Sequence, residues 1–492
     1  MKAFNLGAGR EVLWDMELAD KVTGVSLHMH KPVRKNVVLD CNEPWEGEHC
    51  GYGSMIFDGE RYRLYYRGAG ANDGVWKEES GSHSLWCLAL SDDGKTFTKP
   101  NLGMFEYNGS KDNNIVHMES RMIDNFSVQL DTNPDCPPDE KYKALSLDDL
   151  KEVTVNGEKK YVGSLMYYKS ADGIHFTPVG ILHVKGTFDS LNFVMWDERI
   201  GKYRLYFRDF HPLDREHGIE YEAEAHVRDI RVAFSEDFVN WTEPQLLDYG
   251  DDKLEIQFYT NGIAKYHRAN IFYGMPTRYI DRSPDKINYQ YLPDVGGFRP
   301  MLIQKHGRGG TAITEATVMT SRDGVSFRRT NEAFLTPGIE NGDNWVYGDG
   351  YIVRGMVETA SDFKGEPNEL SLYVGTGYRA RPVTFERYTI RMDGLFSWGA
   401  GFEGGEVLTK PLTFDGGRMS VNFETSALGY LQIDICDENG EPLEGYSTGR
   451  LFGNTTARPC DFAKSLAALS GQAVRLKVSM KDCEFYSFVV ES

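Results

Sequence analysis

Paired cysteines, long apolar runs and an excess of basic residues are all missing from this chain of 492 residues. Its seven cysteines are dispersed and contain no Cys-x-x-Cys pair, which argues against zinc ribbons and thioredoxin-like redox sites and favours free thiols in a reducing compartment. No apolar run reaches the roughly 18 residues of a membrane-spanning helix. The amino-terminal segment also lacks the apolar core of a signal peptide, so we expect a cytoplasmic protein with no membrane partner.

Positive charge is in deficit, because 54 Lys and Arg residues stand against 73 Asp and Glu residues, a formal net charge of −19. Such a surface repels phosphate backbones, which argues against a nucleic-acid partner and favours an uncharged substrate. Solubility alone would also account for the charge. The composition gives no indication of the oligomeric state.

A short pattern, Ser-x-Asp-Gly-x-x-Phe, recurs along the first four-fifths of the chain. Asp-Gly favours the positive φ of a tight turn, and the aromatic residue three positions later anchors the returning strand. A second hairpin precedes each copy, so that each unit contains four strands. The copies begin at Ser91, Ser170, Ser235 (a degenerate copy) and Ser321, with a weaker fifth at Arg391.

Four strands in two hairpins make one blade of a β-propeller. Five such units fit between about residue 45 and residue 395, and strand-like alternation resumes beyond them. The sequence therefore predicts an all-β chain, a five-bladed β-propeller followed by a jelly-roll-like β-sandwich. We expect residues 1–40 to wrap or close the propeller, residues 41–384 to form it, and residues 385–492 to form the sandwich. A plain β-sandwich without a repeat is the alternative.

Residues just before the innermost strand of each blade converge at one end of a propeller axis. Two carboxyl groups there could cleave a glycosidic bond, while amides and aromatic faces suit sugar hydroxyls and rings. We expect catalytic carboxylates at Asp189, Glu46, Asp124 and Glu358. We expect substrate contacts from Trp45, Asn125, Asn192, Tyr259, Asn261, Arg278 and Trp345.

Several of these residues also fit plain structural roles. Glu46 could cap a turn, Asp124-Asn125 could form an Asx-turn, and Glu358 could lie on a solvated strand face. His28 and His30 lack a third nearby ligand, so we predict no metal site and no cofactor. Binding of a divalent cation on the propeller axis is the alternative that the sequence leaves open.

Seven short segments carry a family resemblance. They are Arg10–Asp15, Lys31–Val33, Pro44–Gly47, Tyr65–Gly68, Phe188–Asn192, Tyr259–Asn261 and Met319–Gly324. They resemble bacterial proteins labelled as related to family 32 glycoside hydrolases, and the resemblance covers nearly the whole chain. It implies the five-bladed propeller shared by families 32, 43, 62, 68 and 130. The Asn-Asp-Pro-Asn-Gly motif of family 32 is absent, its Arg-Asp-Pro motif is matched in part by Arg208-Asp209, and its Glu-Cys pair has no counterpart.

These observations predict a glycoside hydrolase, exo-acting, with an axial pocket for an oligosaccharide or glycoside. Retention or inversion depends on the separation of the carboxyl groups, which the sequence leaves open. One alternative is a non-catalytic glycan-binding protein. Another is a glycoside phosphorylase, whose phosphate site would need cations such as Arg278, Arg282, Arg299 or Arg308.

Overall fold

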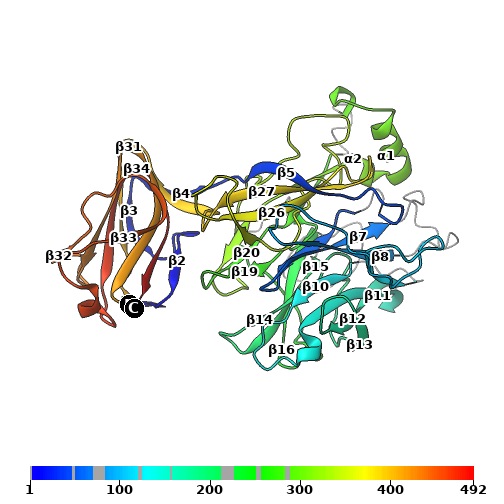
Figure 1. The fold of residues 1–492 in the computed structure, drawn as a ribbon, viewed down its shortest axis with the longest axis horizontal. Helices are drawn as coiled ribbons and strands as arrows, with labels where there is room; N and C mark the ends of the chain where they lie inside the picture. Colours follow the sequence, from blue (N-terminus) through cyan, green and yellow to red (C-terminus); the bar gives the residue numbers. More distant parts are fainter. Residues whose placement is uncertain are drawn as a thin grey trace.

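The computed structural model describes residues 3–46, 50–69, 84–119, 125–155, 158–211, 227–250, 256–282 and 289–491. Almost all regular structure is β, and two bodies are visible in Figure 1, with the carboxy-terminal sandwich on the left and the propeller on the right. The prediction of an all-β chain with a propeller followed by a β-sandwich is confirmed. None of the helices in the described ranges has the length and apolar character needed to cross a bilayer.

Five four-stranded sheets occur among the described residues, and we number them blades one to five along the chain. The first strand of blade one contacts those of blades two and five, and the first strand of blade two contacts that of blade three, as expected of innermost strands around an axis. The strands of each blade, in sheet order, are β6 (Gly53–Phe57), β7 (Tyr62–Ala69), β8 (Ser84–Ser91) and β9 (Ile115–Glu119) in blade one; β10 (Ser127–Leu130), β11 (Tyr142–Val155), β12 (Glu158–Ser170) and β13 (Thr177–Ile181) in blade two; β14 (Phe193–Asp197), β15 (Lys202–His211), β16 (Val227–Ser235) and β17 (Gln245–Leu246) in blade three; β19 (Ala264–Lys265), β20 (Phe272–Gly274), β23 (Met319–Ser321) and β24 (Arg328–Arg329) in blade four; and β25 (Val357–Thr359), β26 (Glu369–Thr376), β27 (Thr384–Arg391) and β5 (Val33–Asp40) in blade five.

The repeated motif forms the turn after the third strand of a blade. In the first copy, Asp93 Oδ1 accepts the backbone N–H of Lys95 at 2.8 Å, and Ser91 Oγ accepts that of Gly94 at 2.9 Å. Gly94 has a φ of 70°, the left-handed conformation that the Asp-Gly pair predicts. In the degenerate third copy Phe238 adopts this conformation, with a φ of 68°, although it carries a side chain.

Tyrosines join each of three turns to the preceding blade. The Tyr65 hydroxyl donates to Gly173 O at 2.8 Å, and the Tyr206 hydroxyl donates to Gly324 O at 2.7 Å. The Tyr373 hydroxyl of blade five donates to Gly94 O of blade one at 2.6 Å. The last of these bonds connects the final blade to the first and therefore closes the ring.

The amino-terminal segment contributes strands to both the propeller and the sandwich. β5 pairs with β27 and completes blade five, whereas the four strands before β5 join the sandwich. The predicted boundary at residue 385 lies inside β27, because that strand pairs with two propeller strands before the chain leaves at Met392. Blade five therefore extends to Arg391.

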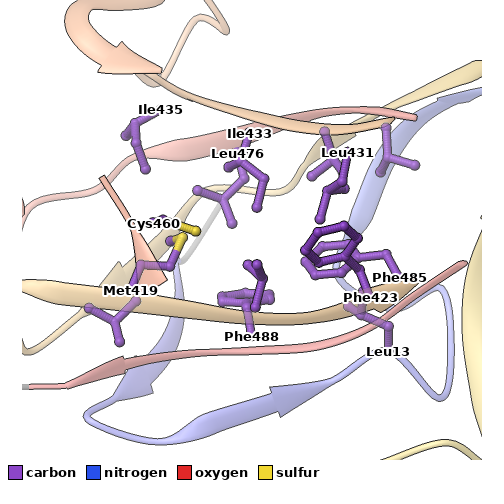
Figure 2. Close-up of a cluster of buried hydrophobic side chains, with 14 of the residues drawn as sticks. Leu13, Met419, Phe423, Leu431, Ile433, Ile435, Cys460, Leu476, Phe485 and Phe488 are labelled. Carbon is purple, nitrogen blue, oxygen red and sulfur yellow. The ribbon is translucent and has the colours of Figure 1, made fainter. Parts of the chain in front are cut away.

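The sandwich core is formed by alternating apolar side chains of its long strands, as Figure 2 shows for Phe423, Leu431, Ile433, Phe485 and Phe488. Pairing of β31 with β34 along most of their length aligns these side chains in register. The strands are β1 (Phe4–Gly7), β2 (Arg10–Val12), β3 (Ala19–Thr23), β4 (Val25–Met29), β28 (Phe396–Ala400), β29 (Gly405–Thr409), β30 (Leu412–Phe414), β31 (Arg418–Cys436), β32 (Pro442–Ser447), β33 (Asn454–Cys460) and β34 (Arg475–Glu491).

The weaker fifth copy of the motif has a different role, because its aspartate lies at the junction of the two bodies. Asp393 is buried and pairs with Arg10 at 3.2 Å and with Arg268 at 3.0 Å. Its carboxylate also accepts the hydroxyls of Tyr266 and Ser487, both at 2.7 Å. This segment is therefore a linker between bodies and not a blade turn.

Blade four is extended beyond the four-stranded sheet and carries most of the helix. A three-stranded sheet, β18 (Gln257–Phe258), β21 (Thr277–Asp281) and β22 (Ala312–Ala316), continues it, and the helices α1 (Phe298–His306) and α2 (Arg308–Thr311) lie between β21 and β22. In Figure 1 both helices lie at the end of the molecule away from the sandwich. Outside this extension, the described residues contain two 3-10 turns, at Pro138–Glu140 and Leu466–Leu469.

Candidate functional site

Asp189 lies at the axial end where the innermost strands begin, four residues before β14. Its side chain is 52% exposed, and Arg208 Nη2 donates to its Oδ2 at 2.5 Å. Arg208 is buried and also donates from Nε to the backbone oxygen of Asp189 at 2.9 Å. The carboxylate is therefore held in place by a buried cation and still reaches solvent.

The loop that carries Asp189 is fixed by buried amides. Asn192 Nδ2 donates to Phe188 O at 3.1 Å and to Ser190 O at 2.8 Å, and Asn261 Nδ2 donates to Leu191 O at 2.9 Å. Both asparagines are fully buried and fix the loop through these bonds. Asn192 Oδ1 has no hydrogen-bond partner among the described residues, and the contact with sugar hydroxyls stays a prediction. Phe188 has a φ of 55°, an unusual conformation of the kind that concentrates at functional sites.

A group of tyrosines adjoins this carboxylate. Arg208 lies over the ring of Tyr259 at 5.2 Å, so the same guanidinium contacts Asp189 and the first tyrosine. The ring of Tyr259 is 5.4 Å from that of Tyr347, and the ring of Tyr351 is 5.4 Å from that of Tyr52. The tyrosine group consists of Tyr52, Tyr259, Tyr347, Tyr351 and Tyr378.

Burial and ion pairing determine the protonation of the tyrosine group and of Arg208. Burial raises the pKa values of Tyr259, Tyr347 and Tyr351, so their hydroxyls keep their protons at neutral pH. Burial alone would lower the pKa of Arg208, but Asp189 and Tyr259 raise it above its ordinary value. The group thus presents protonated hydroxyls and aromatic rings beside the Arg208–Asp189 pair, which suits a polyhydroxylated ring compound.

The loop before blade five brings Trp345, Tyr347 and Asp349 together. Arg299 on α1 donates to the backbone oxygens of Trp345 at 3.3 Å and Asn344 at 2.8 Å, which holds the loop in place. Trp345 is partly exposed, and its indole N–H donates to Gly338 O at 3.0 Å.

Asp349 is the unusual group of this loop, because its carboxylate is almost completely buried. Its Oδ2 accepts the backbone N–H of Val346 at 2.9 Å. Burial raises the pKa of Asp349 to about 7. It therefore exchanges its proton close to neutral pH.

No family model and no curated protein matches this chain. Solved structures do resemble it. An N-acetylgalactosamine deacetylase from F. plautii, in complex with blood group B trisaccharide, is 14% identical over 80% of this chain and 97% of that one, with a TM-score of 0.41. A structure titled glycoside hydrolase is 10% identical over 73% of this chain and 92% of that one, with a TM-score of 0.41. A GH32 beta-fructofuranosidase from Bombyx mori is 8% identical over 92% of this chain and 95% of that one, with a TM-score of 0.38.

Glu46, predicted to be catalytic, is instead enclosed in blade one. Its carboxylate has no exposed surface and binds Lys99 Nζ at 2.8 Å, the Tyr66 hydroxyl at 2.5 Å and the backbone N–H of Glu43 at 2.9 Å. The neighbouring Trp45 uses its indole N–H on Asn114 Oδ1 at 2.8 Å. This turn therefore holds the chain where it enters blade one. Capping a turn was the alternative to catalysis that the sequence left open for Glu46.

Glu358 lies at the other end of the axis. It belongs to β25 and lines a cavity formed by the second halves of the innermost strands, whereas Asp189 precedes its strand. Asn368 Nδ2 donates to Glu358 Oε1 at 2.6 Å, and His267 Nε2 is 3.6 Å from Oε2. Asp189 and Glu358 are thus not brought together. Asp124 lies outside the described residues.

Two predicted substrate contacts have different surroundings. Arg278 pairs with Glu315 across β21 and β22 and donates to Asn331 O at 2.7 Å, so its charge is neutralised within blade four. Asn125, two residues before β10, is buried with a φ of 71°, and neither its Oδ1 nor its Nδ2 has a hydrogen-bond partner among the described residues. Unsatisfied buried amides are rare and call for an explanation such as a functional role.

Sequence reasoning missed most of the tyrosine group. Tyr52, Tyr351 and the predicted Tyr259 each lie shortly before an innermost strand, so their shared position was the available signal.

The described part of the chain contains no cluster of three or more His, Cys, Asp or Glu side chains that could bind a metal ion.

Proposed function

We propose that the chain hydrolyses a glycosidic bond at the axial end that carries Asp189. The observation that supports this is a half-exposed carboxylate, fixed by the buried Arg208, beside a group of neutral tyrosines. Carboxylates act at the anomeric carbon or on the attacking water, and aromatic faces stack on sugar rings.

Asp189 is the proposed nucleophile or general base, because its half-exposed carboxylate pairs with the buried Arg208 and still reaches solvent. The second carboxyl group would be a general acid, which must hold a proton near neutral pH. Asp349 meets this requirement, since burial raises its pKa to about 7. It is two residues from both Tyr347 and Tyr351, which contact Tyr259. Exo-action on an oligosaccharide or glycoside is part of the proposal.

The test is a screen of aryl glycosides and oligosaccharides with the wild-type protein and two matched variants. Asp189→Asn should lower kcat/KM on any substrate found by at least about 100-fold, the scale of lost acid–base or nucleophilic participation. Glu358→Gln removes a carboxylate from the other end of the axis and should leave kcat/KM within about twofold. Equal activity of wild type and Asp189→Asn, or loss of activity in Glu358→Gln alone, would overturn the proposal.

A second candidate is glycan binding without catalysis. It is favoured by the environment of Asp349, whose carboxylate bonds to its own loop and has little exposed surface. In that case the screen yields no turnover, and a glycan array still shows binding that Tyr259→Ala abolishes. Phosphorolysis would instead require phosphate for turnover, and two of its candidate cations, Arg278 and Arg299, are already engaged with Glu315 and with loop carbonyls.

A further inference from the structure

A large cavity lies at the end of the axis opposite to Asp189. Its volume is about 1340 Å³, larger than the roughly 300–1,000 Å³ of common small-molecule pockets. The second halves of the innermost strands form its walls, and the amino-terminal residues from Phe4 to Glu11 close one side. The lining combines charged side chains of both signs with apolar residues in or next to the innermost strands: Met55, Ile56, Val194, Met195, Ala264 and Met356.

Arg354 lies among these apolar residues and lines the cavity. Its backbone is bonded to blade one on both sides, with Arg354 N donating to Gly53 O at 3.2 Å and Met55 N donating to Arg354 O at 2.8 Å. The following Gly355 has a φ of 110°, and a β-carbon there would be only 2.5 Å from Met55 O. The backbone that presents Arg354 is therefore held closely in place.

The guanidinium of Arg354 differs from the other cations of the cavity. Its Nε donates to Ile263 O at 3.2 Å and the group lies over the ring of Phe193 at 5.0 Å, but no carboxylate pairs with it among the described residues. Arg322 pairs with Glu11, and Lys265 pairs with Glu198. Burial lowers the pKa of Arg354, which reflects the free-energy cost of an uncompensated charge.

We propose that this cavity binds a small organic anion whose carboxylate or phosphate group pairs with Arg354. Arginine presents several N–H donors in a planar fork that matches both groups, and a bound anion would compensate the buried charge. The apolar walls and the rings of Trp196, Phe57 and Tyr62 would contact the rest of the ligand. This site is separate from the proposed glycosidase site and does not depend on it.

The test is isothermal titration calorimetry of the full chain with inorganic phosphate and with D-glucuronate at constant ionic strength, with D-glucose as the uncharged counterpart. We expect saturable binding of at least one anion and none of glucose. Arg354→Gln should weaken that binding at least tenfold, while Arg354→Lys, which keeps the charge, should retain part of it. Lys265→Gln removes one positive charge from the same cavity and should change the affinity by less than twofold.

The choice of anion separates the two ligand groups, because binding of phosphate alone indicates a phosphate ester and binding of glucuronate alone indicates a carboxylate. Absence of saturable binding of both anions to the wild type would overturn the proposal. So would unchanged affinity in Arg354→Gln. If Arg354→Gln does not fold, the comparison of wild type with Arg354→Lys and Lys265→Gln decides, since equal weakening by the last two contradicts a specific role for Arg354.

Discussion

The junction between the two bodies gives a prediction about stability that can be worked through from its contacts. Asp393→Asn keeps the shape of the side chain and removes the charge that faces Arg10 and Arg268. Breaking a buried ion pair on one side typically costs about 3–5 kcal/mol. Both arginines retain some solvent contact, with side-chain exposures of 15% and 24%, so the lower end applies and we expect a loss of about 3 kcal/mol.

Denaturation in guanidinium chloride at pH 7 measures this loss, and Asp323→Asn is the matched control. Asp323 occupies the same position of the repeated motif, but its side chain is exposed and accepts backbone N–H groups of Val325 and Ser326, which an asparagine oxygen can also accept. We therefore expect that control to cost less than about 1 kcal/mol. Equal losses in the two variants would refute the reasoning.

The effect should also depend on pH. Arg10 and Arg268 outweigh the desolvation that would raise the pKa of Asp393, and hold it below its ordinary value. A carboxyl group whose folded-state pKa is depressed stabilises the fold above the unfolded-state pKa, near 3.9, and loses this contribution as pH falls through the folded-state value. The difference between wild type and Asp393→Asn should therefore be full at pH 7 and shrink below about pH 4.

Two further predictions concern carboxylates whose roles the structure separates. Glu46→Gln leaves the partly buried Lys99 without its partner, so we expect a loss of about 2–3 kcal/mol in denaturant unfolding with activity per folded molecule unchanged; full stability or lost activity would contradict this. Burial raises the pKa of Asp349 from 3.8 to about 7, which favours folding of the protonated form by about 4 kcal/mol. The stability of the wild-type protein should therefore fall as pH rises from about 4 to about 7, and Asp349→Asn should remove this fall. Melting temperatures from pH 4 to pH 8 measure the slope, and parallel curves for the two proteins would exclude Asp349 as its source.

The fold could be predicted from the sequence where local chemistry determines it. Asp-Gly turns and alternating strands identify hairpins without knowledge of distant contacts, which is why the four main copies of the motif are blade turns. The copy near Asp393 contains the same two residues, but its role depends on Arg10 and Arg268, far away in the chain.

The candidate site could be predicted only in part, for related reasons. Asp189 precedes an innermost strand, and this position was enough to predict that it lies at the end of the axis where these strands begin. Glu358 lies within a strand, and a sequence pattern does not tell which end of the axis such a side chain faces. The burial of Glu46 depends on Lys99 and Tyr66, two residues that only the folded blade brings to it.

The most direct test of the central claim is a crystal structure of Asp189→Asn with the sugar that the wild-type protein cleaves or binds. The account predicts a sugar ring against Tyr259 or Tyr347, with a glycosidic oxygen or hydroxyl within hydrogen-bond distance of the side chain at position 189. A sugar bound only in the cavity lined by Arg354 and Glu358, with no contact to residue 189, would contradict it.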